Sequence, residues 1–341
     1  MTLSDASPVP TAVTDAVTLT PDDLEQLCRD AVRAAGGSEE TAVSLASATV
    51  AAERRGRAEV GAAHLLDYLD AMTHGRLDGR AVPQVVTARA GVLVVDAGGG
   101  TAQVAFDQVR DDLVTRAQEN GIAILSIRGS FTAGEIGHYS TQLAEQGLVA
   151  VVGSNSPALV AALGSRDAVT GTNPLSFALP HPDGPRMFDQ AASATAYVNI
   201  RDAAERGESI PAGWALAPDG QETTDPQAAM LGALLPFGGA KAGNIAFMIE
   251  LLAVLSGSAF SLDAPPFDAG EEPPGVGLFA IAIDPTAFDP EYAQRVEAHL
   301  REIAREHGAD FGRRKTARTH VDLPAPVHSA LARTAAEGAQ E

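Results

Sequence analysis

The middle of the chain holds the residues best suited to grip a small ligand. Glycine, proline and small hydrogen-bonding side chains gather there in five short runs, at 154–157 (SNSP), 171–174 (GTNP), 210–215 (IPAGWA), 223–226 (TTDP) and 235–241 (LPFGGAK). Glycine adopts backbone angles that other residues resist, proline fixes its own, and Asn, Ser, Thr and Asp bond to their own backbone in tight turns. The runs predict rigid polar loops that hold a ligand, although ordinary turns of an α/β protein have the same composition.

The other reactive side chains indicate fewer kinds of chemistry. The eight histidines show no ligand spacing, so no metal site is expected. The single cysteine, Cys28, lies in a helical pattern, which favours a buried structural thiol over a nucleophile. A basic patch near the C-terminus is either a solvated surface or a clamp for a cofactor phosphate, and it comprises Arg313, Arg314, Lys315 and Arg318.

A glycine-rich turn at 97–101 (AGGGT) lies between an apolar run at 92–96 and a helical pattern at 104–119. Such a strand, turn and helix can bind a dinucleotide phosphate at the helix N-terminus. The spacing is not GxGxxG, and Asp107 and Asp111 are unfavourable beside a phosphate. A structural turn is therefore favoured.

Apolar periodicity predicts the elements that must position these loops. A helix should begin at Thr20-Pro21 and end before Gly36-Gly37, and two more should cover 38–56 and 62–72. Further strands are expected at 122–127, 148–153, 175–179 and 278–283, and further helices at 139–145, 241–255 and 290–307.

Composition narrows the class of protein. With 341 residues, 45% hydrophobic and 20% charged, the chain can bury a core large enough for two lobes. The net charge of -20 would repel phosphate backbones, so nucleic-acid binding is not expected. No apolar run is long enough to span a bilayer, and the polar N-terminus shows no signal-peptide core. We expect a flexible tail at 1–18 and a cytoplasmic location.

Read in order, the five loop runs, together with Asp189 and Ser193, resemble those of the type-2 malate/L-lactate dehydrogenase family. That family includes ureidoglycolate and sulfolactate dehydrogenases and a cyclic-imine carboxylate reductase. Weaker similarity extends from about Leu24 to about Leu331. The resemblance implies an α/β fold with a mixed sheet: a non-Rossmann cofactor- and substrate-binding lobe at 91–289 and a smaller helical lobe built from 19–90 and about 290–335. It also implies a homodimer.

The resemblance further implies NAD or NADP as cofactor. Seven residues stand at or near the family's cofactor-contact positions: Ser156, Thr172, Gln190, Ala191, Lys241, Gly312 and Arg313. Lys241 is favoured among them because a cation beside small residues suits a phosphate or a ribose. Its alternative is an ordinary lysine at a helix start.

The proton-handling residues of the family are replaced in this chain. The family's Gly-His-Asp-Ser-His-Gly aligns with 56–61 (GRAEVG), so the catalytic Ser and His become Glu59 and Val60, and His64 stands at the family's Arg. The His of Ser-Asn-His-Phe-Gly becomes Thr132, and the family's Gly-Lys becomes 198–199 (VN). Valine cannot transfer a proton, and a threonine hydroxyl has too high a pKa to act alone.

Four side chains are therefore catalytic candidates beside Asp189, which orients the acid in the family: Glu59, His64, His138 and Thr132. Glu59 could serve if burial raises its pKa, and a histidine could shuttle a proton or hold a carboxylate. Each could equally be an ordinary surface or capping residue.

The expected function is an NAD(P)-dependent oxidoreductase that acts on a 2-oxo or 2-hydroxy acid, a ketone or a cyclic imine, with a rebuilt proton-donor site. Its partner would be a small-molecule substrate, with no nucleic acid and no membrane. Two alternatives stay open on the same scaffold: a non-redox enzyme for cyclisation, elimination or addition, and a catalytically silent binding protein.

Overall fold

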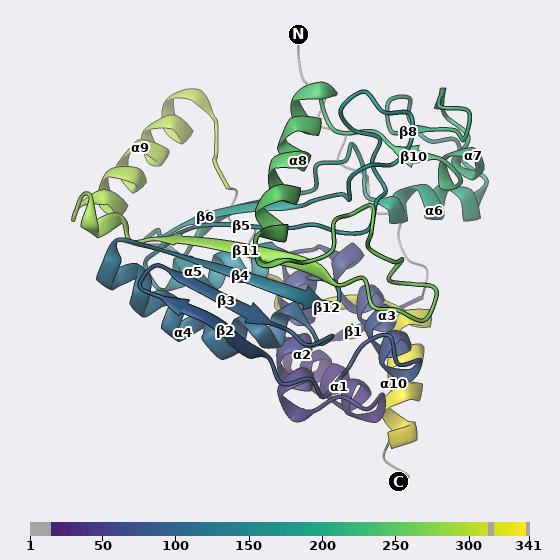
Figure 1. Cartoon of the computed structure of the whole chain (residues 1–341), viewed down its shortest axis with the longest axis horizontal. Coiled ribbons are helices and arrows are strands. Elements are labelled where there is room, and N and C mark those ends of the chain that lie inside the picture. The colour runs from purple at the N-terminus through teal and green to yellow at the C-terminus, as the bar shows by residue number, and fades with distance from the viewer. Residues whose placement is uncertain (1–14, 313–316, 339–341) are drawn as a thin grey trace.

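The structure, a computed structural model, describes residues 15–312 and 317–338 (Figure 1). Residues 1–14 of the tail expected at 1–18, and the predicted cofactor residue Arg313, lie outside these ranges. No helix in the described ranges is long and apolar enough to cross a membrane.

A seven-stranded mixed sheet forms the centre of the molecule, in the order β2-β3-β4-β11-β5-β6-β7. Only β3 and β4 run parallel; every other neighbouring pair is antiparallel. The α/β class with a mixed sheet is thereby confirmed. The strands are β2 (Gln84–Arg89), β3 (Val92–Asp96), β4 (Ile122–Ser130), β5 (Val149–Ser154), β6 (Leu175–Leu179), β7 (Arg186–Gln190) and β11 (Val276–Ile283).

Two helices, α4 (Ala102–Asn120) and α5 (Gly137–Glu145), cover one face of this sheet, and α8 (Ala240–Ala253) packs on the other (Figure 1). The core beneath α4 and α5 includes Phe106 and Tyr139. Their fully buried rings pack edge to face, with 5.1 Å between the ring centroids. Removing each such ring from water contributes about 1.5–3 kcal/mol to stability. This core fixes the start of α5, which borders the site described below.

The predicted unit of strand, glycine turn, helix and strand is present as β3, α4 and β4. Thr101 caps α4 by accepting a hydrogen bond from the Val104 N–H. A Cβ on Gly100 would lie 2.7 Å from the side chain of Ala81, and the N–H of Gly99 donates to Gly129. The turn at 97–101 is thus packed against Ala81 and Gly129, which is consistent with a structural role, and that role stays a prediction.

A helical cluster lies at one end of the sheet (Figure 1). It contains α1 (Pro21–Ala34), α2 (Glu39–Arg54), α3 (Ala62–Thr73) and α10 (Ala325–Gly338), with η1 (Ala58–Val60) before α3. Thr20 and Ser38 cap α1 and α2 with their side chains. Burial raises the pKa of the Cys28 thiol far above its ordinary value, so this cysteine is an inert part of the cluster's core.

A third group of short elements lies on the side of the sheet that carries α8, opposite α4 and α5 (Figure 1). It comprises α6 (Tyr197–Arg206), α7 (Pro226–Met230), β8 (Ala215–Leu216), β9 (Glu222–Thr223) and β10 (Ala233–Leu234). Ile200, Ile210 and Leu234 form its small core. Sequence periodicity did not predict these elements, because two-residue strands and a five-residue helix are too short to show a period.

Two parts of the expected domain division differ from the structure. Residues 16–18 belong to β1 (Ala16–Leu19), which pairs antiparallel with β12 (Val321–Pro324) and is therefore no tail. Helix α9 (Tyr292–His307) stands apart from the helical cluster, beside the far end of the sheet (Figure 1). Its amphipathic pattern showed that one side is apolar, but a pattern does not say which surface that side meets. The division into two lobes stays a prediction.

Candidate functional site

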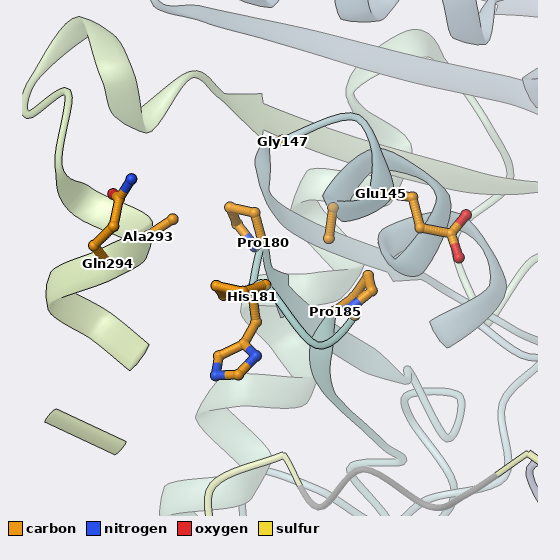
Figure 2. Close-up of a pocket in the computed structure, with 10 residues that line it drawn as sticks. Glu145, Gly147, Pro180, His181, Pro185, Ala293 and Gln294 are labelled. Carbon is orange, nitrogen blue, oxygen red and sulfur yellow. The ribbon is translucent and has the colours of Figure 1, made fainter. Parts of the chain in front are cut away.

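A cavity of about 310 Å³ opens between the helical cluster, the sheet and the start of α6. One wall carries η1 and α3, and the segment between β4 and α5 forms the floor. The opposite wall is made by the loops at 154–157 and 172–174, by 189–193 and by the first turn of α6. A second hollow lies between the β6–β7 turn and α9, and most of the residues that line it are proline, glycine and alanine (Figure 2). There Glu145 and His181 point in different directions, so they form no paired acid and base.

The loop wall of the cavity is interlocked by hydrogen bonds. Ser156 Oγ accepts from the Thr172 N–H at 3.1 Å, Thr172 O accepts from the Ala192 N–H at 2.7 Å, and Ala192 O accepts from the Phe237 N–H at 3.0 Å. A Cβ on Gly171 would lie 2.3 Å from Ser156 Oγ, so only glycine permits this approach. Two of the five runs singled out by composition, at 154–157 and 171–174, therefore line the cavity, and the run at 235–241 bonds to the loop behind them without lining it.

A buried carboxylate behind this wall holds two of its loops. Glu250 of α8, 3% exposed, accepts from Asn173 Nδ2 at 2.8 Å, from the Ser261 N–H at 2.6 Å and from Ser261 Oγ at 2.5 Å. Ser261 Oγ in turn accepts from the Gly171 N–H at 3.0 Å. Three donors satisfy the buried charge without a cation, which makes the loop geometry rigid.

The remaining two runs lie elsewhere. Asp225 in the run at 223–226 caps α7, accepting from the Gln227 N–H at 3.0 Å. Trp214 in the run at 210–215 packs against the core of the third group. Neither residue lines the cavity. Both runs are ordinary turns and caps of the scaffold.

On the opposite wall, three side chains form a hydrogen-bonded chain. His64 Nδ1 lies 2.7 Å from Asp67 Oδ2, and His64 Nε2 lies 3.2 Å from Thr132 Oγ1. All three residues line the cavity. His64 and Asp67 are three residues apart on α3, a spacing that places them on one helix face.

A hydrogen bond to the preceding helix, α2, holds the start of α3 and therefore positions His64. The buried Glu53 of α2 accepts a 2.8 Å hydrogen bond from the Ala62 N–H. A Cβ on Gly61 would lie 2.3 Å from that carboxylate, which explains the glycine at this position. The His64 ring is held edge-on by Tyr68, at 5.1 Å, and by Phe267, at 5.9 Å.

Asp189, the fourth residue of β7, lines the cavity from the edge of the sheet. Its Oδ2 accepts a 2.8 Å hydrogen bond from the Gly137 N–H at the start of α5, and Arg57 Nη1 donates to its backbone carbonyl at 3.1 Å. Burial raises the pKa of the Asp189 carboxyl to about 6, against the lowering influence of the Gly137 N–H and of Arg57. Asp189 can therefore change its protonation near neutral pH.

Two ion pairs complete the polar lining. Arg57 Nε lies 2.5 Å from Glu59 Oε1, with both side chains about one-third exposed. Arg55 of the helical cluster bonds both oxygens of Glu135, whose side chain is 1% exposed, at 2.5–3.0 Å. This bidentate pair ties the end of α2 to the cavity floor.

The structure brings seven of the twelve predicted site residues to this cavity: Glu59, His64, Thr132, Ser156, Thr172, Asp189 and Ala191. Their individual roles stay predictions. The prediction for Glu59 was conditional on burial, and that condition is not met, because Glu59 is exposed and paired with Arg57.

The structure does not place His138 in the cavity, contrary to the expectation. It is 5% exposed inside α5 and bonded to Gln142 at 2.8 Å. Burial, helped by the charges of Arg55 and Arg110, lowers the pKa of His138 to about 3, so it is neutral at physiological pH. The Gly137–Asp189 bond turns the start of α5 so that the next side chain points into the core.

The remaining predicted cofactor residues do not line the cavity. Gln190 is exposed at the end of β7, and Lys241 is exposed on the first turn of α8. Gly312 has a positive φ of 55° and packs closely on Met187 of β7. Their contact with a cofactor stays a prediction, and Arg313 is outside the described ranges.

Several cavity residues were not singled out from the sequence: Arg57, Asp67, Tyr197, Arg201 and Phe267. Two signals were available. Asp67 follows His64 at helical spacing, and Arg201 follows Tyr197 one turn later on α6. Phe267 gave no such signal, because it comes from an irregular acidic loop.

Among residues 15–312 and 317–338, no group of three or more His, Cys, Asp or Glu could hold a metal ion. The loop wall suits a nicotinamide instead. Ser156 presents a hydroxyl beside the apolar Leu159 and Ala191, and the side chains of Ser154 and Asn155 hold this wall by bonding to the backbone of Ala259 and Gly277. A ring with one flat apolar face and one amide requires such a mixed lining.

A mixed sheet, a helical cluster and a cavity between them, with hydroxyl-lined loops opposite an acid–base cluster, define an oxidoreductase scaffold. The chain belongs to the malate/L-lactate dehydrogenase family, whose sequence profile matches residues 19–316. The predictions of the family and of an oxidoreductase are thereby confirmed.

Individual relatives place the chain more finely within the family. It is 38% identical over 281 residues to a Delta(1)-pyrroline-2-carboxylate/Delta(1)-piperideine-2-carboxylate reductase of Pseudomonas putida, covering 80% of this chain and 82% of that protein. It is 36% identical over 289 residues to a (2R)-3-sulfolactate dehydrogenase (NADP(+)) of Chromohalobacter salexigens, covering 84% and 86%. The predicted cofactor class, NAD or NADP, agrees with the NADP(+) in the name of the second relative.

A solved structure shows the same fold. The delta1-piperideine-2-carboxylate reductase of Pseudomonas syringae superposes with a TM-score of 0.81 at 35% identity, covering 94% of this chain and 95% of that one. The expected malate/sulfolactate dehydrogenase type of fold is confirmed by this match.

Proposed function

We propose that the protein is an NAD(P)-dependent reductase that adds hydride to a carbonyl or imine carbon beside a carboxylate. Its substrate would be a 2-oxo acid or a cyclic imine 2-carboxylate, with the 2-hydroxy acid as the reverse substrate. One observation carries the proposal: the interlocked loops of 154–157 and 171–174 and the cluster of Asp67, His64, Thr132 and Asp189 line one cavity.

The two walls of the cavity would have different roles, one binding the cofactor and the other supplying a proton. Ser156, Thr172 and Ala191 would hold the nicotinamide end of the cofactor, and the buried Glu250 keeps their loops rigid. When bound, a reduced nicotinamide supplies the hydride. The protein must then orient the substrate against it, exclude water and provide a proton from the opposite wall.

The substrate carboxylate needs a cation, and Arg201 supports that role best. It lines the cavity from α6, one turn after Tyr197, and forms no ion pair or hydrogen bond within the described residues. Arg57 also lines the cavity but is engaged by Glu59 and by the Asp189 carbonyl. The planar guanidinium of an arginine, with its five N–H donors, matches a planar carboxylate.

The names of the relatives favour a cyclic imine over an open-chain acid as the first substrate to examine. We also infer a homodimer, because α8 and the short helix η2 (Val254–Ser256) that follows it expose an apolar stripe. The stripe comprises Phe247 (41% exposed), Met248 (47%) and Leu251 (46%) of α8 and Leu255 (64%) of η2. A cytoplasmic location is supported by the single unpaired cysteine.

Cofactor binding and turnover test the function separately. NADH or NADPH should raise the melting temperature, because a ligand that binds only the folded state stabilises it. Loss of reduced-nicotinamide absorbance with Delta(1)-piperideine-2-carboxylate, or with pyruvate as the simplest 2-oxo acid, would establish the reaction. No melting shift with either cofactor sinks the proposal. Binding without oxidation in the presence of either substrate favours a non-redox enzyme or a binding protein.

A further inference from the structure

The family's usual proton donors are absent from this chain, yet a reductase must protonate the oxygen or nitrogen that its hydride leaves electron-rich. We propose that Asp67, His64 and Thr132 form a proton relay in which Thr132 Oγ1 protonates the substrate and His64 replaces that proton. This inference rests on the proposed function and names the groups that complete it.

The geometry provides a continuous path from solvent to the cavity. The side chain of Asp67 is 38% exposed, that of His64 is 15% exposed, and Thr132 lies on the cavity floor. The distances of 2.7 Å and 3.2 Å along the chain are those of hydrogen bonds. Asp67 accepts from Nδ1 and so directs Nε2 at the hydroxyl, the arrangement by which an orienting carboxylate sets a histidine tautomer.

Supporting contacts hold both ends of the relay in place. Tyr68 donates a 2.9 Å hydrogen bond to the backbone carbonyl of Thr132, and Gln103 donates to the Tyr68 hydroxyl at 3.1 Å. Tyr68 and Phe267 fix the plane of the His64 ring from two sides. Such support is what a positioned acid requires, because proton transfer is effective only within hydrogen-bond reach.

The step balances as follows. The hydride supplied by the reduced nicotinamide forms the new C–H bond, and the π bond of the C=O or C=N group breaks. The Thr132 hydroxyl proton passes to the oxygen or nitrogen, and the Nε2 proton of cationic His64 passes to Thr132 Oγ1. Thr132 is unchanged, and His64 ends neutral with its Nδ1–H still hydrogen-bonded to the Asp67 carboxylate. A proton taken up from water then restores the Nε2–H.

The other candidate donors fit less well. Glu59 is exposed and paired with Arg57, and His138 is outside the cavity. Burial raises the pKa of Tyr68 to about 12, and its hydroxyl already donates to Thr132 O. Asp189 is the one serious rival, but its Oδ2 holds the start of α5, and within residues 15–312 and 317–338 no hydrogen bond joins its side chain to an exposed group.

Paired variants separate the hydroxyl from its surroundings. Thr132→Val removes the hydroxyl at nearly constant shape, and Thr132→Ser keeps it. With Delta(1)-piperideine-2-carboxylate as substrate, we expect Thr132→Val and His64→Gln to lower kcat by about 10²-fold or more, because general acids contribute 10²–10⁴-fold. Thr132→Ser should keep most of the activity. The affinity for NADPH, from fluorescence, should stay within about twofold in all three.

Asp67 is a positioning residue in this scheme, so its role is tested by measuring which tautomer the His64 ring adopts. In the wild type, nitrogen chemical shifts of the His64 ring should show the Nδ1–H tautomer, and in Asp67→Asn that preference should weaken. Imidazole added to His64→Ala should restore part of the turnover. His74→Gln is the matched control: His74 pairs with Asp70 at 3.1 Å at the end of the same helix, outside the cavity.

The outcomes separate this inference from the proposed function. If the wild type oxidises no reduced cofactor, the function itself fails. If the wild type is active but Thr132→Val keeps its kcat and its solvent isotope effect, the relay is wrong. If Asp189→Asn loses kcat and the solvent isotope effect while Thr132→Val keeps them, Asp189 is the proton donor. Equal losses in Thr132→Val and Thr132→Ser would also overturn the relay, because the hydroxyl would then be irrelevant.

Discussion

The carboxylate of Asp189, near the end of β7, accepts a 2.8 Å hydrogen bond from the backbone N–H of Gly137, the first residue of α5. A Cβ on Gly137 would lie 3.3 Å from that carboxylate and 2.8 Å from the side chain of Met187. The strand and the helix therefore meet closely at this acid and this glycine, and a side chain at position 137 would displace the end of Met187. The same contact places a titratable carboxyl in the cavity and buries it.

Asp189→Asn should change how stability depends on pH. Burial raises the pKa of Asp189 to about 6, from about 3.9 in an unfolded chain. Its favourable contribution is complete below about pH 4 and is lost as the pH rises through 6, because the folded state must then ionise a buried group. Between pH 4.5 and 7.5, the wild type should lose about 2 kcal/mol relative to Asp189→Asn.

Urea unfolding of both proteins at the two pH values measures this difference. Other carboxylates titrate equally in both chains, so the comparison cancels them. Asn can still accept the Gly137 N–H, which makes it the matched replacement. If the unfolding free energies of the wild type and of Asp189→Asn change equally between the two pH values, the pKa of Asp189 is not raised by folding.

Gly171→Ala should disrupt the loop wall. The added Cβ would lie 2.3 Å from Ser156 Oγ and 2.4 Å from its carbonyl oxygen, so the two loops must separate. We expect a loss of about 1–3 kcal/mol in stability, because the Thr172 N–H loses its buried acceptor. NADPH should also bind at least several-fold more weakly, which a fluorescence titration measures.

Gly91→Ala is the control for this effect. Its Cβ would meet only the Ile122 carbonyl, at an ordinary 3.4 Å, and Gly91 lies outside the cavity. It should leave NADPH affinity unchanged. Equal cofactor affinity in both variants would mean that the loop wall does not contact the cofactor.

The sequence predicted long periodic elements well. α1 begins at Pro21 and α2 after Ser38, as their capping residues indicated, and β4, β5, β6 and β11 lie where apolar runs were found. β2 was missed, because it is a largely exposed edge strand that shows no alternation of buried and exposed residues. Local pattern reports burial, and an edge strand has little.

The site was predictable only in part. Composition located the loops at 154–157 and 171–174, because close backbone approach demands glycine and small polar residues. It could not separate them from the turns at 210–215 and 223–226, which have the same composition and a scaffold role. The His64–Thr132 contact joins residues 68 positions apart, so only the fold reveals that two altered positions face each other.

Lys241→Ala tests the cofactor prediction that the cavity leaves open. Lys241 lies on the exposed first turn of α8, beyond the residues that line the cavity. If it binds a phosphate of the cofactor, the variant should lose about 1–3 kcal/mol of NADPH affinity, and Lys241→Arg should retain most of it. The loss should shrink at high salt, because an exposed ion pair is screened. An unchanged dissociation constant would remove Lys241 from the site.

Arg201→Gln should weaken binding of the substrate far more than it slows the reaction. Arg201 lines the cavity without an ion partner in the described chain, so its charge is available to a carboxylate. Loss of a charge-assisted hydrogen bond costs about 1.5–3 kcal/mol, which corresponds to roughly a 10- to 150-fold rise in KM. The value of kcat should change little, because the carboxylate is bound equally in the ground and transition states.

Arg206→Gln provides the comparison within the same helix. Arg206 lies near the end of α6, is paired with Glu208 at 2.8 Å and does not line the cavity. Both substitutions remove one positive charge from an acidic protein, so any long-range electrostatic effect on an anionic substrate is common to both. The ratio of their KM values therefore isolates direct contact at Arg201. A ratio near one would move the carboxylate to Arg57, the other arginine on the cavity wall.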